Sequence, residues 1–455
     1  MTRLPVVSLL VLCAGALLHP TRAAAVTRAE RSPALAATLR DAPRGEGHLV
    51  WVYLKDKGAR PALAPLSPRA LARRALRGEV QGVDAGDLAL DPGYLRAVAD
   101  RVTRLRHSSR WMNAVSVEAT AAQVEAVEAL PFVARTDVVR RFQRRREPVE
   151  PGHTVQAQSQ QGPVIPHVHN YGSAIFQVHQ INVANVHDIG IDGRGVVVAV
   201  FDSGFDNLAH EVFSQTGIAA TRDFVNGDES VADGDVGEGS HGTATLSTLG
   251  GYRSGQLIGT AFGATYLLAK TENTESETPV EEDNWAAAAE WAEALGADVI
   301  SSSLGYITYD SPFPSYTFAD MNGDTAISTN AADRAAERGI VVVNSAGNEG
   351  LNTQHNTLGA PSDGHLVVAV GAVTFQGARA SFSSVGPSAD GRIKPDVVAL
   401  MLQANPRATV DQVIGTLRAT ASRAATPDNQ LGYGIVNALA AVQAITALPA
   451  ASSPD

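Results

Sequence analysis

The stretch GVVVAVFDSGFD, residues 195–206, decides the fold of the second half of this chain. Its apolar, β-branched run at 196–201 has glycine on both sides, which predicts a strand buried on both faces. The run ends at Asp202, and open α/β sheets place their chemistry at the carboxyl ends of such strands. Taken alone, Asp202 fits a simple turn cap at least as well, so the rest of the chain must decide its role.

Strand and helix patterns alternate from about Gln180 onward. They predict strands at 266–270, 298–303, 340–345 and 366–373, and helices at 242–249, 280–295, 331–338, 409–421 and 435–448. Such alternation is typical of a parallel sheet with helices on both faces. We therefore expect an α/β fold with a mostly parallel sheet.

A small α+β unit is predicted before it, at about 48–139. Its strands are expected at 48–54, 111–119 and 132–139, and its helices at 67–76 and 120–130. The arginine-rich run RRFQRRR at 140–146 and a polar stretch after it mark a boundary. This run fits a solvated linker and an exposed processing site equally well.

The first 25 residues are typical of a secretory signal, with Arg3, an apolar stretch at 4–18 and small residues at 23–25. We therefore expect a secreted protein, extracellular or periplasmic, with no membrane span in its mature form. The only cysteine, Cys13, lies inside this segment. A mature chain without cysteine has no disulfide, thiolate nucleophile or cysteine metal ligand.

Charge is unevenly distributed along the chain. Residues 40–150 carry 20 Lys and Arg against 14 Asp and Glu, whereas residues 151–455 carry 12 against 32. A basic block followed by an acidic block predicts two units that attract each other. It excludes nucleic acid as a partner of the larger unit.

Three polar residues recur at the ends of predicted strands or the start of a helix. Asp202 is followed by His241 in GSHGT and by Asn348 in SAGNEG. A carboxylate can hold an imidazole in one tautomer, and that imidazole can serve as base and then acid. An asparagine amide can donate to a developing oxyanion. In this order, the three residues indicate an acyl-transfer site.

With these motifs the chain resembles the subtilisin-like serine peptidases from about Gln180 onward. Further matching segments are SHGTATLSTLGG at 240–251, SSSLGY at 301–306, VVVNSAGNEG at 341–350, FSSVGP at 382–387, GRIKPDVVA at 391–399, LQANP at 402–406 and GYGIVNALAA at 432–441. The resemblance implies that Asp202 orients His241, that His241 is the general base and acid, and that Asn348 lines the oxyanion hole.

The resemblance also implies how substrates and partners bind. It assigns substrate binding to the residues that flank an extended peptide, Ser303, Leu304, Gly305, Ala346 and Gly347. The unit at 48–139 resembles the family's propeptide, a folding helper that covers the cleft, chiefly through the block at 111–133. Expected partners are therefore protein or peptide substrates and the chain's own propeptide, with the chain a monomer.

These expectations divide the chain into five parts: a signal peptide at 1–25, a propeptide with its basic processing linker at 26–147, a linker and N-terminal arm at 148–179, a peptidase domain at 180–448 and a disordered tail at 449–455.

The sequence departs from the family at the third member of the triad. In the family, KPDVVA leads to a Gly-Thr-Ser-x-Ala-x-Pro segment that starts a long helix. Here Ala399 continues through Leu400 and Met401 into LQANP, which belongs to the far end of that helix, and no Gly-Thr-Ser tripeptide occurs anywhere. We therefore expect a deletion at 399–401 and a peptidase that is inactive as written. The alternative is a catalytically dead pseudo-peptidase that binds peptides or a propeptide.

Other serines and a metal loop are weaker candidates. Ser203 belongs to the strand-end motif, and Ser383 and Ser384 lie in FSSVGP, which the family uses structurally, so none is expected to replace the nucleophile. No cofactor is expected to be required. The oxygen ligands Asp320, Asn322 and Asp324 alternate as in a structural Ca²⁺ loop, although a solvated turn explains the same pattern.

Overall fold

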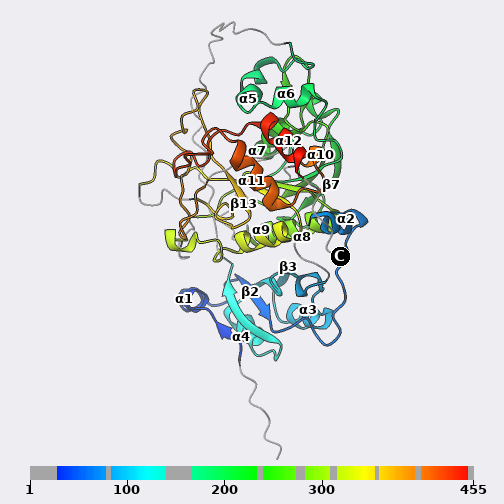
Figure 1. Ribbon diagram of the computed structural model, residues 1–455. Coiled ribbons are helices and arrows are strands. Elements are labelled where there is room, and N and C mark those ends of the chain that lie inside the picture. Colours follow the sequence, from blue (N-terminus) through cyan, green and yellow to red (C-terminus); the bar gives the residue numbers. More distant parts are fainter. Residues whose placement is uncertain are drawn as a thin grey trace, which may run out of the picture.

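The computed structural model describes residues 28–77, 83–139, 166–232, 239–272, 282–307, 315–353, 358–394 and 401–448, which form two domains (Figure 1). The predicted signal peptide, the arginine-rich run at 140–146, the junction at 399–400 and the tail lie outside these residues. Among the described residues, no helix has the length and apolar character needed to cross a membrane.

The N-terminal domain is built on a five-stranded sheet of order β1-β5-β2-β4-β3. The strands are β1 (Glu30–Arg31), β2 (His48–Leu54), β3 (Arg104–Ser109), β4 (Ala114–Ala119) and β5 (Val133–Val138). Its helices are α1 (Pro33–Asp41), α2 (Pro68–Arg77), α3 (Pro92–Ala99) and α4 (Ala121–Glu128), with a 3₁₀ turn η1 (Ala85–Asp87). All strand pairs are antiparallel except β1–β5.

The three strands and two helices predicted for this domain are present, and helix α4 shows why the sequence specifies them. The Thr120 hydroxyl accepts a bond from the Gln123 N–H, and the Gln123 side chain accepts one from the Thr120 N–H at 2.8 Å. This reciprocal cap satisfies two amides at the helix start. Strand β3 was not predicted, because its sequence RLRHSS has little apolar alternation and binds its surroundings through polar side chains.

The C-terminal domain contains a six-stranded, fully parallel sheet of order β13-β12-β11-β6-β10-β7. The strands are β6 (Val197–Asp202), β7 (Gly217–Asp223), β10 (Thr265–Lys270), β11 (Val299–Ser302), β12 (Val341–Ser345) and β13 (Val367–Val370). The two short strands β8 (Tyr252–Arg253) and β9 (Leu257–Ile258) form a hairpin. The predicted α/β fold with a parallel sheet is confirmed, and β6 lies inside it.

Successive residues of β6 point to opposite faces, as the pleat of a strand requires. Ala199 and Phe201 join the apolar cluster that contains α8 (Glu282–Leu295) and α9 (Ile327–Glu337). Val198 and Val200 join the cluster on the other face, with α7 (Ser240–Gly250), α11 (Val410–Thr420) and α12 (Ala438–Ala447). The same alternation directs the next even-numbered residue, Asp202, toward the face of α7.

Some boundaries differ from those predicted. Helix α9 starts at Ile327, four residues before the predicted 331. The stretch assigned to a linker and arm contains η2 (Gly172–Ala174) and α5 (Ile175–Gln180), and α6 (Val183–Asp188) follows. Short polar helices of this kind have too few residues to show a helical period. The remaining elements are α10 (Met401–Ala404), η3 (Glu211–Phe213) and η4 (Phe318–Asp320).

The two domains share one continuous apolar cluster, which includes strand residues of the N-terminal sheet and residues of α8 and α9. In Figure 1 the blue-to-cyan domain lies against α8 and α9, and α2 lies beside α8. The N-terminal domain therefore covers the helical layer on one face of the parallel sheet.

Candidate active site and the domain contact

Asp202 and His241 lie together at the carboxyl end of β6. The His241 Nδ1 atom is 2.6 Å from Asp202 Oδ1, and the aspartate is fully buried. The Thr245 hydroxyl donates to Asp202 Oδ2 at 3.0 Å, and the Ser203 N–H donates to Oδ1 at 2.7 Å. With its carboxylate held from both sides, Asp202 fixes the Nδ1–H tautomer of His241, so that Nε2 is the nitrogen that can accept a proton.

Helix α7 lies very close to the end of β6, and this closeness lets His241 reach Asp202. A Cβ added to Gly242 would lie 2.1 Å from the Gly204 carbonyl oxygen and 3.0 Å from Asp202 Cβ. Only glycine fits after His241, because any side chain would push the helix away from the strand. Thr245 was missed in the sequence, although its position four residues after His241 puts both on the same helix face.

Asn348 lies on the exposed loop that follows β12. Ser384 holds this loop: its N–H donates to the Gly347 oxygen at 2.9 Å, and its hydroxyl accepts from the Glu349 N–H at 3.0 Å. Gly347 has a φ of +108°, where a side chain would be strained and would meet Ser384 Oγ. The loop thus holds Asn348 beyond the carboxyl end of β12, at the same edge of the parallel sheet as Asp202.

Three serines near the site are buried in supporting roles. Ser203, Ser383 and Ser384 are 0%, 2% and 1% exposed. The Ser383 hydroxyl accepts from the Ala372 N–H at 3.0 Å, and the Ser203 hydroxyl donates to Asp202 at 3.3 Å. A nucleophile must reach a substrate carbonyl, so these buried contacts support the structural roles expected from the sequence.

The predicted substrate segments follow two adjacent strands, β11 and β12. Ser303 and Gly305 are half-buried, and Leu304 is buried with its carbonyl accepting from the Asn344 amide at 2.8 Å. Ala346 is fully buried, and its oxygen accepts from the Gly359 N–H. Parallel strands end at a common edge, so these segments lie at the same edge as Asp202.

A hollow of about 700 Å³ opens beside the first turn of α7. Ser240 and Thr243, which flank His241 in sequence, line it together with Asp206, His210 and Arg253.

The sheet face toward α7 is incompletely covered. Val200, Ser301, Val343 and Val368 form one row across four strands. Val200 and Val368 are 1% and 0% exposed, but Ser301 and Val343 between them are only half-buried. A cavity of about 30 Å³ opens on this face and touches both of these residues. Inner strands of a parallel sheet are normally buried on both faces, so the segments that the structure describes cover Ser301 and Val343 less fully than Val200 and Val368.

The candidate calcium residues lie within one turn region but already have partners. Asp320 Oδ2 accepts from the Thr317 N–H at 2.7 Å, and Asn322 Oδ1 accepts from the Asp324 N–H at 2.8 Å. In the described segments, no three His, Asp or Glu side chains are grouped as metal ligands. A structural Ca²⁺ site at Asp320, Asn322 and Asp324 stays a prediction.

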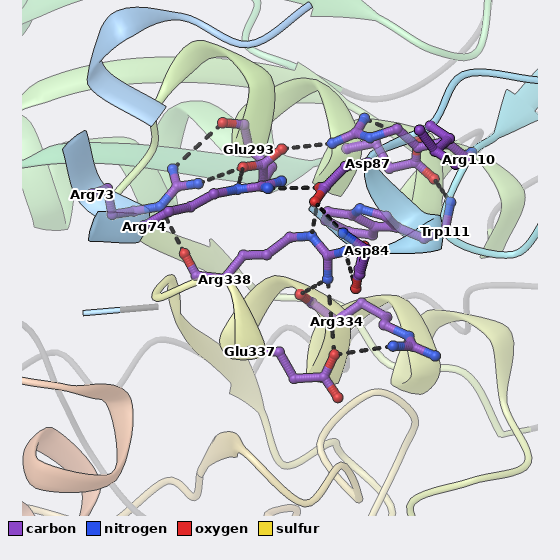
Figure 2. Close-up of polar contacts among 12 residues, drawn as sticks. Arg73, Arg74, Asp84, Asp87, Arg110, Trp111, Glu293, Arg334, Glu337 and Arg338 are labelled. Carbon is purple, nitrogen blue, oxygen red and sulfur yellow. Dashed lines mark hydrogen bonds and ion pairs between the residues drawn. The ribbon is translucent and has the colours of Figure 1, made fainter. Parts of the chain in front are cut away.

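The contact between the two domains is built from buried charges of opposite sign (Figure 2). Glu293 on α8 is fully buried and accepts from three guanidinium groups of the N-terminal domain: Arg73 at 2.6 Å, Arg74 at 2.9 Å and Arg110 at 2.5 Å. Asp298 pairs in the same way with Arg77 of α2. Burial lowers the pKa of Arg73 to about 10. The arrangement confirms that the basic and acidic blocks attract each other.

Two further carboxylates of α8 extend this contact. Glu290 accepts from the Ser109 hydroxyl at 2.6 Å and from the backbone N–H groups of Arg110 and Trp111 at 3.1 Å. Asp283 accepts from Arg106 at 3.2 Å.

Two ion pairs in the contact have the opposite polarity, those of Arg338 with Asp84 and Asp87. The fully buried Arg338, from the C-terminal domain, donates to Asp84 at 2.8 Å and lies 5.2 Å from the Trp111 ring centroid. Both domains therefore contribute cations and anions to the contact. This pattern of charges specifies how the two domains dock, in addition to attracting them to each other.

Comparison with known proteins agrees with this architecture. The profile described as the Subtilase family matches residues 193–400, and that of the Peptidase S8 propeptide domain of Bacteroidota matches residues 49–154. Subtilisin of Bacillus pumilus is 33% identical over 220 residues, which cover 48% of this chain and 71% of that protein. This chain belongs to the subtilase family, the subtilisin-like serine peptidases, and its N-terminal domain is a propeptide domain.

Two other similar proteins show the extent of the likeness. Subtilisin NAT of Bacillus subtilis subsp. natto is 33% identical over 224 residues, or 49% of this chain and 52% of that protein. The chain thus spans about half the length of this curated relative. The crystal structure of fervidolysin from Fervidobacterium pennivorans superposes with a TM-score of 0.57 at 18% identity, covering 93% of this chain and 64% of fervidolysin.

Proposed function

We propose that this chain carries the proton-transfer machinery of a secreted, monomeric serine endopeptidase. We also propose that the chain with the sequence printed above, called the printed chain below, does not hydrolyse peptide bonds. The observation that carries the proposal is the 2.6 Å contact between His241 Nδ1 and the fully buried Asp202. An imidazole fixed in this way is suited to deprotonate a serine hydroxyl and then protonate a leaving amine.

The printed chain lacks the serine needed for the first chemical step of peptide hydrolysis. A serine Oγ would attack the substrate carbonyl, pass its proton to His241 Nε2 and form an acyl-enzyme, while the Asn348 amide donates to the oxyanion. Removal of that donor costs roughly 10²–10³-fold in kcat, a value measured on subtilisin itself. Without a nucleophile, only a residual rate of roughly 10³–10⁴ over water is expected, again from subtilisin.

Thin cover over the sheet supports a deletion at 399–401 as the origin of the missing serine. In the family the Gly-Thr-Ser segment starts a long helix, and here Ser301 and Val343 lie half-buried on the face toward α7. A helix restored on this face would bury them and fill the adjoining cavity. Resequencing the coding region around Ala399–Met401 tests this origin, and a continuous reading through Gly-Thr-Ser is the expected result.

The direct experiment is a gain of function. The Gly-Thr-Ser-containing stretch of the B. pumilus subtilisin is inserted after Ala399, and hydrolysis of a chromogenic peptide is compared with that of the printed chain. We expect turnover only in the insertion variant, and we expect His241→Ala to abolish it. A matched insertion with the serine replaced by alanine controls for repaired folding. Equal turnover by the printed chain would contradict the proposal, and an insertion variant that folds but stays inactive would count against the assigned site.

A second function is favoured by the domain contact, namely that of a non-hydrolytic protein that holds its propeptide or a peptide. The buried ion pairs at Glu293 and Asp298 support a tightly held N-terminal domain. Peptide binding by the printed chain, measured by fluorescence anisotropy, tests this function. A chain that binds no peptide, whether or not residues 48–139 are present, would rule it out.

A further inference from the structure

Histidines are concentrated in the N-terminal arm of the C-terminal domain, away from the catalytic pair. Four of the twelve histidines of the chain, His167, His169, His179 and His187, lie within 21 consecutive residues. His167 and His169 precede η2, His179 lies in α5 and His187 lies in α6. No role in peptide hydrolysis explains this concentration.

Two of these rings meet nitrogen to nitrogen. The Nε2 atoms of His167 and His179 are 2.5 Å apart, and the ring planes meet at 89° with centroids 4.7 Å apart. This separation is shorter than the usual donor–acceptor distance of a nitrogen hydrogen bond, about 2.7–3.2 Å. Imidazole nitrogens are common zinc ligands, and two of them this close together can bind one cation after a small separation.

Asp188 orients the first of the two rings. Its Oδ2 lies 2.7 Å from His167 Nδ1, and its Oδ1 accepts from the Val168 N–H at 2.9 Å. A carboxylate that accepts from Nδ1–H leaves the lone pair on Nε2, directed toward His179. Carboxylate, histidine and metal in this order are the typical outer support of a metal ligand.

The second ring is suited to the same task. Its Nε2 atom faces the His167 nitrogen whose lone pair the Asp188 contact leaves available. The His167 side chain is buried, whereas His179 is exposed at the end of α5. One ligand is therefore fixed and the other can adjust.

The other two histidines have different partners: His187 uses both ring nitrogens, and His169 Nδ1 lies 3.4 Å from the Tyr252 hydroxyl. His187 Nδ1 lies 2.7 Å from the Tyr171 hydroxyl, and its Nε2 lies 3.1 Å from the Thr260 oxygen. His169 lies among aromatic rings, with the Phe262 centroid at 5.2 Å. Across the described ranges, no set of three His, Asp or Glu ligands forms. A metal at His167 and His179 would therefore keep open positions for water.

We propose that His167 and His179 form an open binding site for a borderline divalent cation such as Zn²⁺ or Cu²⁺, with Asp188 as the group that positions His167. Imidazole suits both metals. With metal–nitrogen bonds of about 2.0–2.1 Å and a tetrahedral angle, the two nitrogens would lie about 3.3 Å apart. A movement of the exposed His179 by less than about 1 Å reaches this distance. The bound ion would join the start of the arm to α5.

Calorimetry of the full chain tests this proposal. After EDTA treatment and dialysis, the chain is titrated with ZnCl₂, and we expect one bound ion per chain. His167→Ala and His179→Ala should each abolish this binding, and Asp188→Asn should weaken it roughly 10–100-fold. The matched control is His169→Phe, which keeps an aromatic ring in the same cluster and should bind Zn²⁺ like the unmodified chain.

Electron paramagnetic resonance with Cu²⁺ gives an independent measurement. We expect superhyperfine coupling to two nitrogens in the unmodified chain and loss of this signal in His179→Ala, a variant whose exposed side chain makes loss of folding no explanation. No Zn²⁺ binding by the unmodified chain would show that the two rings form a hydrogen bond only. Equal binding by His179→Ala would place the ion elsewhere. Either result overturns the proposal.

Discussion

Removal of the Glu293 carboxylate should weaken the docking of the two domains and lower the free energy of unfolding of the chain. This side chain is fully buried on α8 and accepts from the guanidinium groups of Arg73, Arg74 and Arg110. Arg74 retains Asp87 and Arg110 retains Glu290 when Glu293 becomes alanine, but the side chain of Arg73, only 1% exposed, loses its carboxylate partner.

The expected magnitude follows from leaving this cation buried without an anion. Breaking a buried ion pair by removing one partner costs about 3–5 kcal/mol. The equilibrium between docked and unfolded states should therefore shift by about a hundred- to a few-thousand-fold. Arg73→Met should cost less, because Glu293 then keeps two of its three guanidinium partners.

Urea unfolding of the intact chain measures this effect. Trp51 and Trp111 report on the N-terminal domain, and Trp285 and Trp291 on α8, so intrinsic fluorescence follows both sides of the contact. The matched control is Glu125→Ala, whose side chain is 61% exposed and pairs with Arg28 at 3.9 Å. That pair should contribute under about 1 kcal/mol. A loss below about 1 kcal/mol for Glu293→Ala, with an unchanged denaturant slope, would refute the reasoning.

Three further changes test other parts of the structure. Burial lowers the pKa of His107 below its usual 6.5, so the folded chain keeps this ring neutral at a pH where the unfolded chain protonates it. The contribution of the neutral ring to the free energy of unfolding is therefore complete above pH 6.5. It is lost as the pH falls, by up to about 1.4 kcal/mol per pH unit. The difference between urea unfolding of the unmodified chain and of His107→Gln should follow this course, and a difference independent of pH from 7 to 5 would contradict it. Thr120→Ala removes the hydroxyl cap of α4 and should lower the unfolding free energy by about 0.5–2 kcal/mol; Thr120→Ser should preserve it, and equal losses in both would argue against the cap. Gly242→Ala, made in the insertion variant, places a Cβ 2.1 Å from a backbone oxygen and should lower kcat roughly 10²-fold by displacing His241; unchanged kcat would show that α7 can move without cost.

Much of the C-terminal fold follows from the sequence because its strands are apolar and β-branched. The run before Asp202 predicted β6, and even the side on which the carboxylate lies follows from the alternation of Val198 and Val200. The pairing of Asp202 with His241 could be expected from their order and from glycine after the histidine. The attraction between the domains could be read from the unequal charge of the two blocks.

Other features depend on tertiary contacts that leave no local pattern. Strand β3 is specified by partners on α8, since Arg106 binds Asp283 and Ser109 binds Glu290, and neither pair is close in sequence. The role of Ser384 in holding the loop that carries Asn348 becomes visible only when two distant segments meet. The half-buried state of Val343 likewise reflects which helix covers the sheet, which no property of that residue alone can predict.

Labelling with a fluorophosphonate probe tests the central claim most directly, because the probe forms a covalent adduct only with a serine that a neighbouring base activates. Peptide mass spectrometry then locates the adduct in the printed chain and in the insertion variant. We expect no adduct in the printed chain and one adduct, dependent on His241, at the inserted serine. An adduct at Ser203, Ser383 or Ser384 of the printed chain would contradict the claim that its catalytic pair lacks a nucleophile.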